Sequence, residues 1–250
     1  KSIRNRGNCN ICDKQGKREL KMGERIEKVC IYGVGGVGGY FGGKIVHETD
    51  GKDQKRYNIT FVARGEHLNR IRKDGLILNT SRQQGLICRP DMATDDISDL
   101  PIQDIVLICV KSYDLDNAVK NINRIVDGNS VIVPLLNGVD IYTRVRKYLD
   151  RVVVLPSCAY VATSIERPGV VTQSGNDGLI MTGKDPAFPD YYPDILFRLF
   201  DEAKIAYKWS ENPYPAIWEK YLFIAAYGLV TAYSGKTFGE LLENEILKGK

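Results

Sequence analysis

The fold of this chain is decided by the stretch KVCIYGVGGVGGYFGG, residues 28–43. Its first part, 28–34, is a short apolar run ending in glycine, which is typical of a fully buried strand in a parallel sheet. Gly33, Gly35 and Gly38 have the spacing G-x-G-x-x-G, and the residues after them have the apolar spacing of a helix. A strand, a glycine turn and a helix in this order predict a dinucleotide-binding unit.

Each glycine of this loop has a separate task in such a unit. Gly33 allows the tight turn, Gly35 lets the backbone approach a pyrophosphate, and Gly38 lets helix and strand pack closely. The free N–H groups at the helix N-terminus then face the phosphates. The alternative is a glycine turn used only for packing. We predict that the loop binds the cofactor through Gly33, Val34, Gly35, Gly36, Val37 and Gly38.

The end of the second expected strand, residues 57–64, indicates which dinucleotide binds. An acidic residue there accepts a hydrogen bond from the ribose of NAD, whereas an arginine holds the 2′-phosphate of NADP. This chain has Arg64 at that point, and its guanidinium can bind a phosphate through two parallel N–H groups. Glu66 could be the acid of an NAD site, but it comes after Gly65. We therefore predict NADP(H), with an arginine that merely ends a surface strand as the alternative.

The rest of the chain to about residue 210 alternates between strand and helix patterns, which predicts a doubly wound α/β sheet of the Rossmann type. The expected strands are 104–111, 130–140 and 152–164, with two smaller ones around a turn at 75–80 and 85–90, and a hairpin formed by 169–175 and 178–183. The expected helices are 65–75, 115–126, 141–149 and 191–205.

The pattern changes at SENPYP, residues 210–215, after which everything has the character of helix. We predict three segments: a disordered basic extension at 1–21, an NADP-binding domain at 22–209, and the beginning of an all-α domain at 210–250. About 40 residues are too few for an independent core, so the last segment is expected to pack on the first domain or on a partner.

Charge excludes one class of partner. Residues 1–21 hold seven Lys and Arg against two acidic residues, whereas 28 basic and 29 acidic residues follow from Met22 onward. The body of the protein is therefore close to neutral, and no nucleic-acid-binding face is expected. The most apolar run, 221–234, carries no charge, is too short to span a bilayer and favours a buried helix, so no membrane partner is expected either.

Neither the cysteines nor the histidines predict a metal site. Cys9 and Cys12 form a lone C-x-x-C pair, and a zinc site needs four ligands. The other cysteines lie in apolar runs and are expected to be free core thiols, which favours a reducing compartment such as the cytoplasm. His47 and His67 have no carboxylate or cysteine set around them and are expected to be surface or satisfied residues.

Three further polar residues occupy positions suited to chemistry. Lys111 and Asn137 directly follow two expected strands, and the carboxyl ends of parallel strands line the ligand crevice. Lys220 stands at the start of an otherwise apolar helix. Each has an ordinary alternative: a solvated side chain at a strand end, or the wet end of a core helix. A desolvated lysine is also a proton donor with a tunable pKa.

Together, YGVGGVGGYFGG, TFVARGEHLNRIRKDGL, VKSYDLDNAV, LLNGVD, RPGVV and WEKYLF resemble, in this order, the ketopantoate reductase family over residues 27–240. The resemblance implies a Rossmann domain that binds NADPH and a helical domain that closes over the substrate, 2-dehydropantoate (ketopantoate). It implies reduction of this 2-oxoacid to pantoate for pantothenate and coenzyme A synthesis. Lys220 matches the catalytic lysine of the family, and Lys111 and Asn137 match positions that contact the cofactor. A homodimer is compatible with the resemblance.

The chain departs from the family pattern at two places. Family members often carry asparagines four and eight residues after the lysine, where this chain has Ile224 and Gly228. The family also continues for a long helical segment with an acidic residue, so the chain is expected to be truncated. These departures leave two rivals to the ketopantoate reductase hypothesis: an NADP-binding sensor or remnant without catalysis, and a related reductase of another 2-oxoacid.

Overall fold

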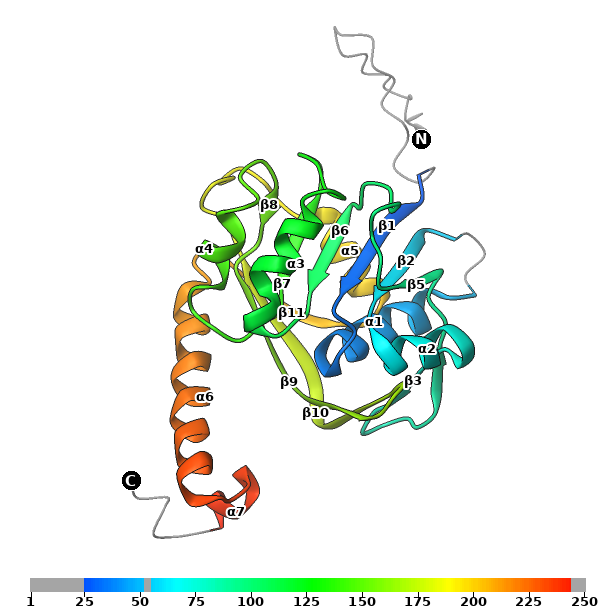
Figure 1. The fold of residues 1–250 in the computed structure, drawn as a ribbon. Helices are drawn as coiled ribbons and strands as arrows, with labels where there is room; N and C mark the ends of the chain where they lie inside the picture. The colour runs from blue at the N-terminus through cyan, green and yellow to red at the C-terminus, as the bar shows by residue number, and fades with distance from the viewer. Residues whose placement is uncertain (1–24, 52–54, 244–250) are drawn as a thin grey trace, which may run out of the picture.

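The structure, a computed structural model, describes residues 25–51 and 55–243, and it contains two sheets with one helix between them (Figure 1). The strands are β1 (Glu27–Tyr32), β2 (Tyr57–Val62), β3 (Leu76–Asn79), β4 (Leu86–Cys88), β5 (Met92–Thr94), β6 (Ile105–Ile108), β7 (Val131–Pro134), β8 (Val153–Val154), β9 (Ser157–Arg167), β10 (Val170–Gly183) and β11 (Ala206–Ser210). The helices are α1 (Gly36–Thr49), α2 (Gly65–Asp74), the 3₁₀ turn η1 (Ser112–Asp114), α3 (Leu115–Ile122), α4 (Ile141–Arg146), α5 (Asp194–Glu202), α6 (Tyr214–Ser234) and α7 (Phe238–Leu242).

The first sheet is parallel and has the order β5-β2-β1-β6-β7-β8. With the strands counted along the chain within this sheet, the order is 3-2-1-4-5-6, that of a doubly wound dinucleotide-binding fold. The predicted fold class is therefore confirmed. The strands of this sheet are short and β-branched, and β6 and β7 are buried along their whole length, as expected for strands covered on both faces.

The second sheet was not predicted. It has the order β11-β10-β3-β4, and β9 pairs antiparallel with β10. The chain passes from the first sheet to the second at Pro156, so the expected strand 152–164 is in fact two strands, β8 and β9. Proline has no N–H for a ladder and therefore suits the point where one sheet is left for another.

The predicted hairpin of 169–175 with 178–183 is wrong. Both segments belong to the single strand β10, which pairs with β9 and has a register shift between Ser174 and Leu179. The Gln173 side chain donates to the carbonyls of Ser174, Gly175 and Asn176. These bonds hold the extra residues as a bulge, so the strand continues through the segment instead of turning back.

Helix α1 lies between the two sheets and is buried on most of its circumference. A Cβ on Gly39 would lie 2.6 Å from a methyl of Val171 in β10, and one on Gly43 would lie 3.0 Å from a methyl of Leu78 in β3. Glycine costs about 1 kcal/mol per residue within a helix. In α1 it permits the second sheet to approach the helix backbone, and so it joins both sheets in one core.

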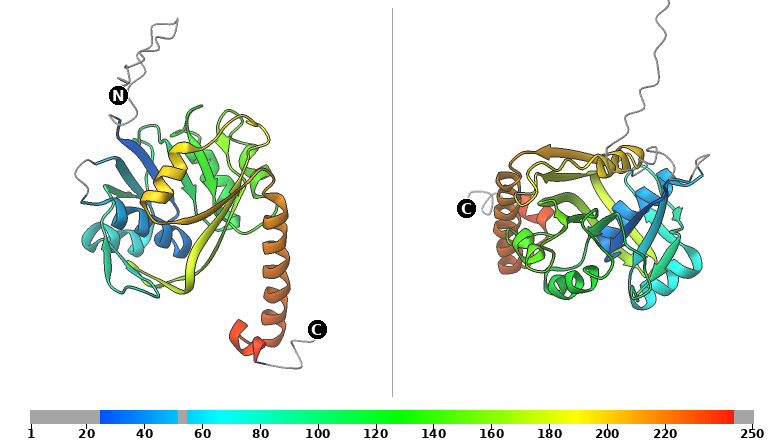
Figure 2. Two further views of the ribbon diagram at one scale, coloured as in Figure 1. Left: turned by 180° about the vertical axis from the view of Figure 1, so that it is seen from behind. Right: turned by 90° about the horizontal axis from the view of Figure 1, so that it is seen from above.

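Helix α6 leaves the body of the molecule after its first turns (Figures 1 and 2). The expectation of a buried helix is wrong for the described residues, because only Ile217 and Lys220 of α6 are buried. Large apolar side chains along the helix are exposed, namely Trp218, Tyr221, Leu222, Phe223, Leu229 and Tyr233. Among the described residues, no helix is long and apolar enough to cross a membrane. The proposed segments 1–21, 22–209 and 210–250 remain predictions, the first of them lying outside the described residues.

Candidate functional site

The predicted cofactor residues lie at the carboxyl ends of the first sheet. The strand order reverses between β1 and β6, and ligands of doubly wound folds bind at this switch point. The glycine loop follows β1, Arg64 follows β2, Lys111 follows β6 and Asn137 follows β7. The topology thus brings all of these residues to one edge of the sheet.

The geometry of the glycine loop explains its three spaced glycines. Gly33 has a φ of 96°, and a Cβ there would lie 2.8 Å from a methyl of Val110. A Cβ on Gly38 would lie 2.3 Å from the carbonyl oxygen of Gly33. A Cβ on Gly35, in contrast, would meet no atom of the described residues within 4 Å. Two of the glycines are therefore required by the fold itself, whereas the third faces open space.

The N-terminus of α1 fits the pyrophosphate of a dinucleotide. The helix begins at Gly36, no side chain of the described residues caps it, and its first turn contains no acidic residue. The first N–H groups of a helix have no partner within the helix, and they carry the positive end of its dipole. With open space beside Gly35, these amides form a cradle suited to an anion.

Arg64 and Lys111 provide positive charge on the two sides of this cradle. Arg64 precedes the first turn of α2, its side chain is 81% exposed, and its Nη2 lies 3.1 Å from Oδ2 of Asp114. Lys111 precedes η1 and is exposed, and it forms no ion pair among the described residues. Asn137 is exposed directly after Leu136. The sequence reasoning missed Asp114, because nothing in its spacing indicates that it meets Arg64.

Lys220 is buried, with only 7% of its surface exposed. Its Nζ donates a hydrogen bond to the carbonyl oxygen of Ala159 in β9. The ammonium also lies over the ring of Tyr160, 5.3 Å from the centroid, where the negative face of the ring attracts it. Lys220 is therefore not the solvated end of a core helix, since it points inward from the first turns of α6 onto a strand.

Burial lowers the pKa of Lys220 below the ordinary lysine value of 10.5, and the Cys158 thiol opposes this change. The same burial raises the pKa of Cys158, and the charge of Lys220 opposes that change in turn. Desolvation disfavours the charged ammonium, which makes Lys220 a stronger acid than a lysine in water. Such a group can hold a proton near neutral pH and donate it to a developing oxyanion.

Strand β9 connects Lys220 to the glycine loop. Its residue Ala159 binds Lys220, and four residues later Thr163 packs against Gly36, where a Cβ would lie 2.9 Å from the Thr163 hydroxyl. Four residues of strand span about 13 Å. The sequence reasoning missed both Tyr160 and Thr163, because β9 was expected to be part of a single sheet and to have no contact with the loop.

The base of α6 is fixed over the end of β7. Ile217 lines a small hollow together with Gly138 and Ser157. Tyr142 of α4 packs edge-on against Tyr214 of α6, and its hydroxyl donates to Asp185 at 2.7 Å. This anchoring keeps Lys220 beside the strand ends that carry the predicted cofactor residues.

Asp185 is the centre of a buried network under this region. Its side chain is fully buried and forms an ion pair with Arg146. It also accepts hydrogen bonds from the backbone N–H of Val154 at 2.7 Å and of Ala187 at 2.9 Å. Together with Arg146 and the Tyr142 hydroxyl, these two amides give Asp185 four hydrogen-bond donors, which compensate for the cost of burying its charge.

The face of α6 beyond Lys220 carries little hydrogen-bonding capacity. Ile224 is half-buried, and a Cβ on Gly228 would meet no atom within 4 Å. The Thr231 hydroxyl is used by the carbonyl of Gly228. Glu240 forms the capping box of α7 with Thr237 and so is engaged within its own turn.

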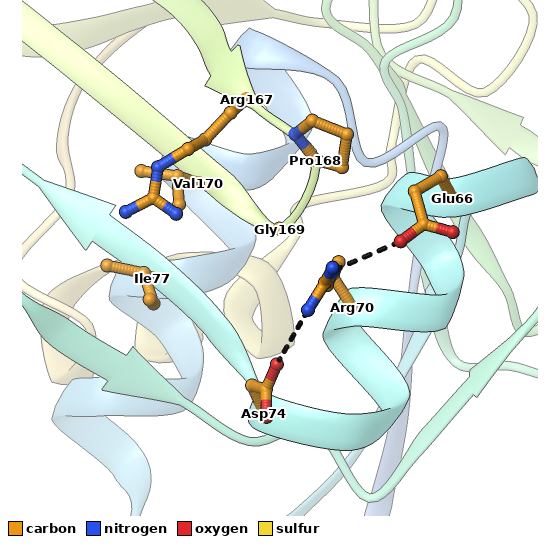
Figure 3. Close-up of a pocket in the computed structure, with 9 residues that line it drawn as sticks. Glu66, Arg70, Asp74, Ile77, Arg167, Pro168, Gly169 and Val170 are labelled. Carbon is orange, nitrogen blue, oxygen red and sulfur yellow. Dashed lines mark hydrogen bonds and ion pairs between the residues drawn. The ribbon is translucent and has the colours of Figure 1, made fainter.

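A hollow of about 300 Å³ lies elsewhere, between α2 and the turn that joins β9 to β10 (Figure 3). On the α2 side of this hollow, Arg70 lies between Glu66 and Asp74 and forms ion pairs with both. Beside it, Nδ1 of His67 accepts the N–H of Gly169 at 3.0 Å, and burial lowers the pKa of this imidazole. His47 is exposed. The hollow contains none of the predicted site residues.

The described cysteines, Cys30, Cys88, Cys109 and Cys158, are free. Within the described ranges, no group of three or more His, Cys, Asp or Glu side chains could hold a metal ion. Cys9 and Cys12 lie outside the described residues. Burial raises the pKa of both Cys30 and Cys88 to about 12, so these thiols are packing residues and not nucleophiles.

Several known proteins similar to this chain are ketopantoate reductases. The family model for ketopantoate reductase PanE/ApbA matches residues 29–186. A 2-dehydropantoate 2-reductase of Halobacterium salinarum is 27% identical over 217 residues, which cover 86% of this chain and 68% of that protein. The crystal structure of 2-dehydropantoate 2-reductase from Porphyromonas gingivalis W83 is 30% identical, with a TM-score of 0.78 and coverage of 88% of this chain and 77% of that one.

The fold alone is shared more widely. A ternary structure of D-mandelate dehydrogenase with NADH and anilino(oxo)acetate has a TM-score of 0.73 at 17% identity, with coverage of 88% of this chain and 68% of that one.

Proposed function

Because the chain belongs to the ketopantoate reductase PanE/ApbA family, we propose that it acts in the NADPH-dependent reduction of 2-dehydropantoate to pantoate, a step of pantothenate and coenzyme A biosynthesis. The family resemblance that its motifs predict is confirmed, and the fold is that of an NAD(P)-binding reductase. The substrate and the pathway belong to the proposal, since these relatives share only 25–30% identity with the chain.

One observation carries the proposal: strand β9 links a buried lysine to the glycine loop. Lys220 binds Ala159 at one point of the strand, and Thr163 packs on Gly36 at another. A dinucleotide with its pyrophosphate at the N-terminus of α1 would extend along the edge of the sheet toward the region that α6 covers. A 2-oxoacid bound there would have Lys220 beside its keto group.

NADPH, when bound, supplies the hydride that reduces the keto carbon. The chain must then stabilise the negative charge that develops on the carbonyl oxygen. Lys220 spends one of its three N–H groups on Ala159 and has two left to donate to this oxygen. Its lowered pKa favours transfer of the proton to the alkoxide, which completes the hydroxy acid.

The remaining site residues bind and orient. The backbone amides from Gly36 onward would hold the pyrophosphate, and Arg64 would hold the 2′-phosphate that distinguishes NADPH. Lys111 and Asn137 follow neighbouring strands and would contact the cofactor and the nicotinamide end of the site. These assignments support a preference for NADPH over NADH.

The proposal is tested by turnover of the purified protein. NADPH consumption is measured with 2-dehydropantoate and, in parallel, with 2-oxoacids whose side chains lack the hydroxyl. We expect 2-dehydropantoate to give the highest kcat/KM. NADPH binding without turnover of any 2-oxoacid would contradict a reductase and favour the non-catalytic binding module instead.

A second candidate is reduction of a different 2-oxoacid, one with an apolar side chain. The observation that favours it is the face of α6 beyond Lys220, where Ile224 and the open position at Gly228 offer no hydrogen bond to a substrate hydroxyl. In the same assay, a higher kcat/KM for a branched or aromatic 2-oxoacid than for 2-dehydropantoate would select this candidate.

A further inference from the structure

The ion pair between Arg64 and Asp114 joins the loops on either side of β1. Arg64 follows β2, Asp114 ends the turn η1 that follows β6, and β1 lies between these two strands in the sheet. The pair, with 3.1 Å between Nη2 and Oδ2, therefore spans the carboxyl end of β1, from which the glycine loop begins. The residue assigned to the 2′-phosphate is already held by a carboxylate.

In the described structure, the Asp114 side chain supports neither helix α3 nor a second ion pair. Its side chain does not cap α3, although it stands at the N-cap position. Among the described residues, the Asp114 side chain hydrogen-bonds to Arg64 alone, and 35% of this side chain is exposed. The next acid along the helix, Asp116, is engaged with Arg144 at 2.9 Å and has no contact with Arg64.

We propose that Asp114 determines the selectivity between NADPH and NADH, an inference that rests on the proposed function. To bind Arg64, the 2′-phosphate of NADPH would have to replace Asp114 as the partner of the guanidinium, and it would then lie close to a carboxylate of like charge. The 2′-hydroxyl of NADH carries no charge and leaves the ion pair in place. Asp114 thus weakens NADPH binding selectively and brings the two affinities closer together.

The test is Asp114→Asn, which removes the charge and keeps the shape of the side chain. Dissociation constants of NADPH and NADH are measured by fluorescence titration of the complete chain. We expect the Kd of NADPH to fall by roughly two- to tenfold, the effect of one or two exposed charge interactions, with NADH nearly unchanged. The gain should shrink at high ionic strength, because both side chains are accessible to salt.

Asp116→Asn is the matched control. It removes the same charge at the start of the same helix but frees Arg144 instead of Arg64, so the ratio of the two dissociation constants should stay unchanged. In an Arg64→Ala background, Asp114→Asn should lower the Kd of NADPH by less, because there is no guanidinium for which the carboxylate and the 2′-phosphate compete.

The results distinguish a failure of the role of Asp114 from a failure of the proposed function. An unchanged ratio in Asp114→Asn, or a shift toward NADH, overturns the role of Asp114 and leaves the proposed function intact. If the unmodified protein binds neither dinucleotide, the proposed function is overturned, and the inference with it.

Discussion

Lys220 of α6 donates a hydrogen bond to the carbonyl oxygen of Ala159, which lies 61 residues earlier in the chain. The position of the ammonium is therefore set by strand β9 as well as by its own helix. Because β9 also packs on the glycine loop through Thr163, the proposed proton donor and the proposed phosphate site share one rigid support.

Lys220→Ala should abolish catalysis without loss of cofactor binding. Removal of a positioned proton donor lowers kcat by roughly 10²- to 10⁴-fold. The lysine has no contact with the glycine loop, so the Kd of NADPH should stay within about twofold, well under the tenfold that 1.4 kcal/mol produces. Both are measured on the purified variant, with the exposed Lys236→Ala as control. A variant that keeps its kcat would exclude Lys220 as the donor.

The rate should fall on the alkaline side through the titration of Lys220. A proton donor works only while protonated, so kcat/KM is constant at low pH and declines as pH rises through its pKa, which burial holds below 10.5. A pH profile of kcat/KM measures this. In Lys220→Arg the guanidinium stays protonated, so any remaining activity should lack the decline. An identical decline in that variant would assign it to another group.

The two glycines Gly35 and Gly38 should respond in opposite ways to alanine. At Gly35 the new methyl enters open space, so the free energy of unfolding should hardly change. The methyl nevertheless occupies the phosphate cradle, and the Kd of NADPH should rise by roughly tenfold, a loss of about 1.4 kcal/mol. At Gly38 the methyl would lie 2.3 Å from the carbonyl oxygen of Gly33, and such overpacking costs roughly 1–3 kcal/mol of stability.

Urea denaturation and NADPH titration of both variants check this contrast. If both variants lost the same amount of NADPH affinity and the same free energy of unfolding, the loop would have only a packing role.

Asp185→Ala should be the most destabilising of these substitutions. It leaves the partly buried Arg146 without the fully buried carboxylate that pairs with it, and removal of one member of a buried pair costs about 3–5 kcal/mol of the free energy of unfolding. Asp116→Ala, which breaks the partly exposed pair with Arg144, should cost less than about 1 kcal/mol. Chemical denaturation of both variants measures the difference. Similar costs would mean that the Asp185 network is not a support of the fold.

The first sheet could be predicted from the sequence because each of its main features is local. An apolar run before G-x-G-x-x-G, and polar residues directly after buried strands, identify β1, β6 and β7 and the edge where they end. The helix α2 begins at Gly65 and ends before Gly75, whose φ of 82° terminates it, as the glycine predicts. These features need no knowledge of distant contacts.

The second sheet could not be predicted, because its pairings are distant and its strands are irregular. The bulge of β10 depends on the side chain of Gln173, and without that contact the segment has the glycine pattern of a turn. The short strand β11 at the edge of this sheet has a weak pattern of its own. For the same reason the contacts of Tyr160 and Thr163 with the site were not visible in the sequence.

The helix α6 shows the converse case. Its composition alone favours burial, yet most of its large apolar residues are exposed in the described structure. Composition gives the hydrophobicity of a segment but not which other segments pack against it. Lys220, the residue least suited to burial, is one of the two that are buried.

The placement of α1 between two sheets has a consequence for how the chain reaches its native state. All strands of the first sheet are available once residue 154 has been made, but the second sheet needs β3 and β10, whose residues Asn79 and Thr172 are 93 positions apart. Closing such a distant pairing is slow. During synthesis, the side of α1 that faces the second sheet therefore stays exposed until β10 has left the ribosome. The nascent chain is most prone to misassembly during this interval.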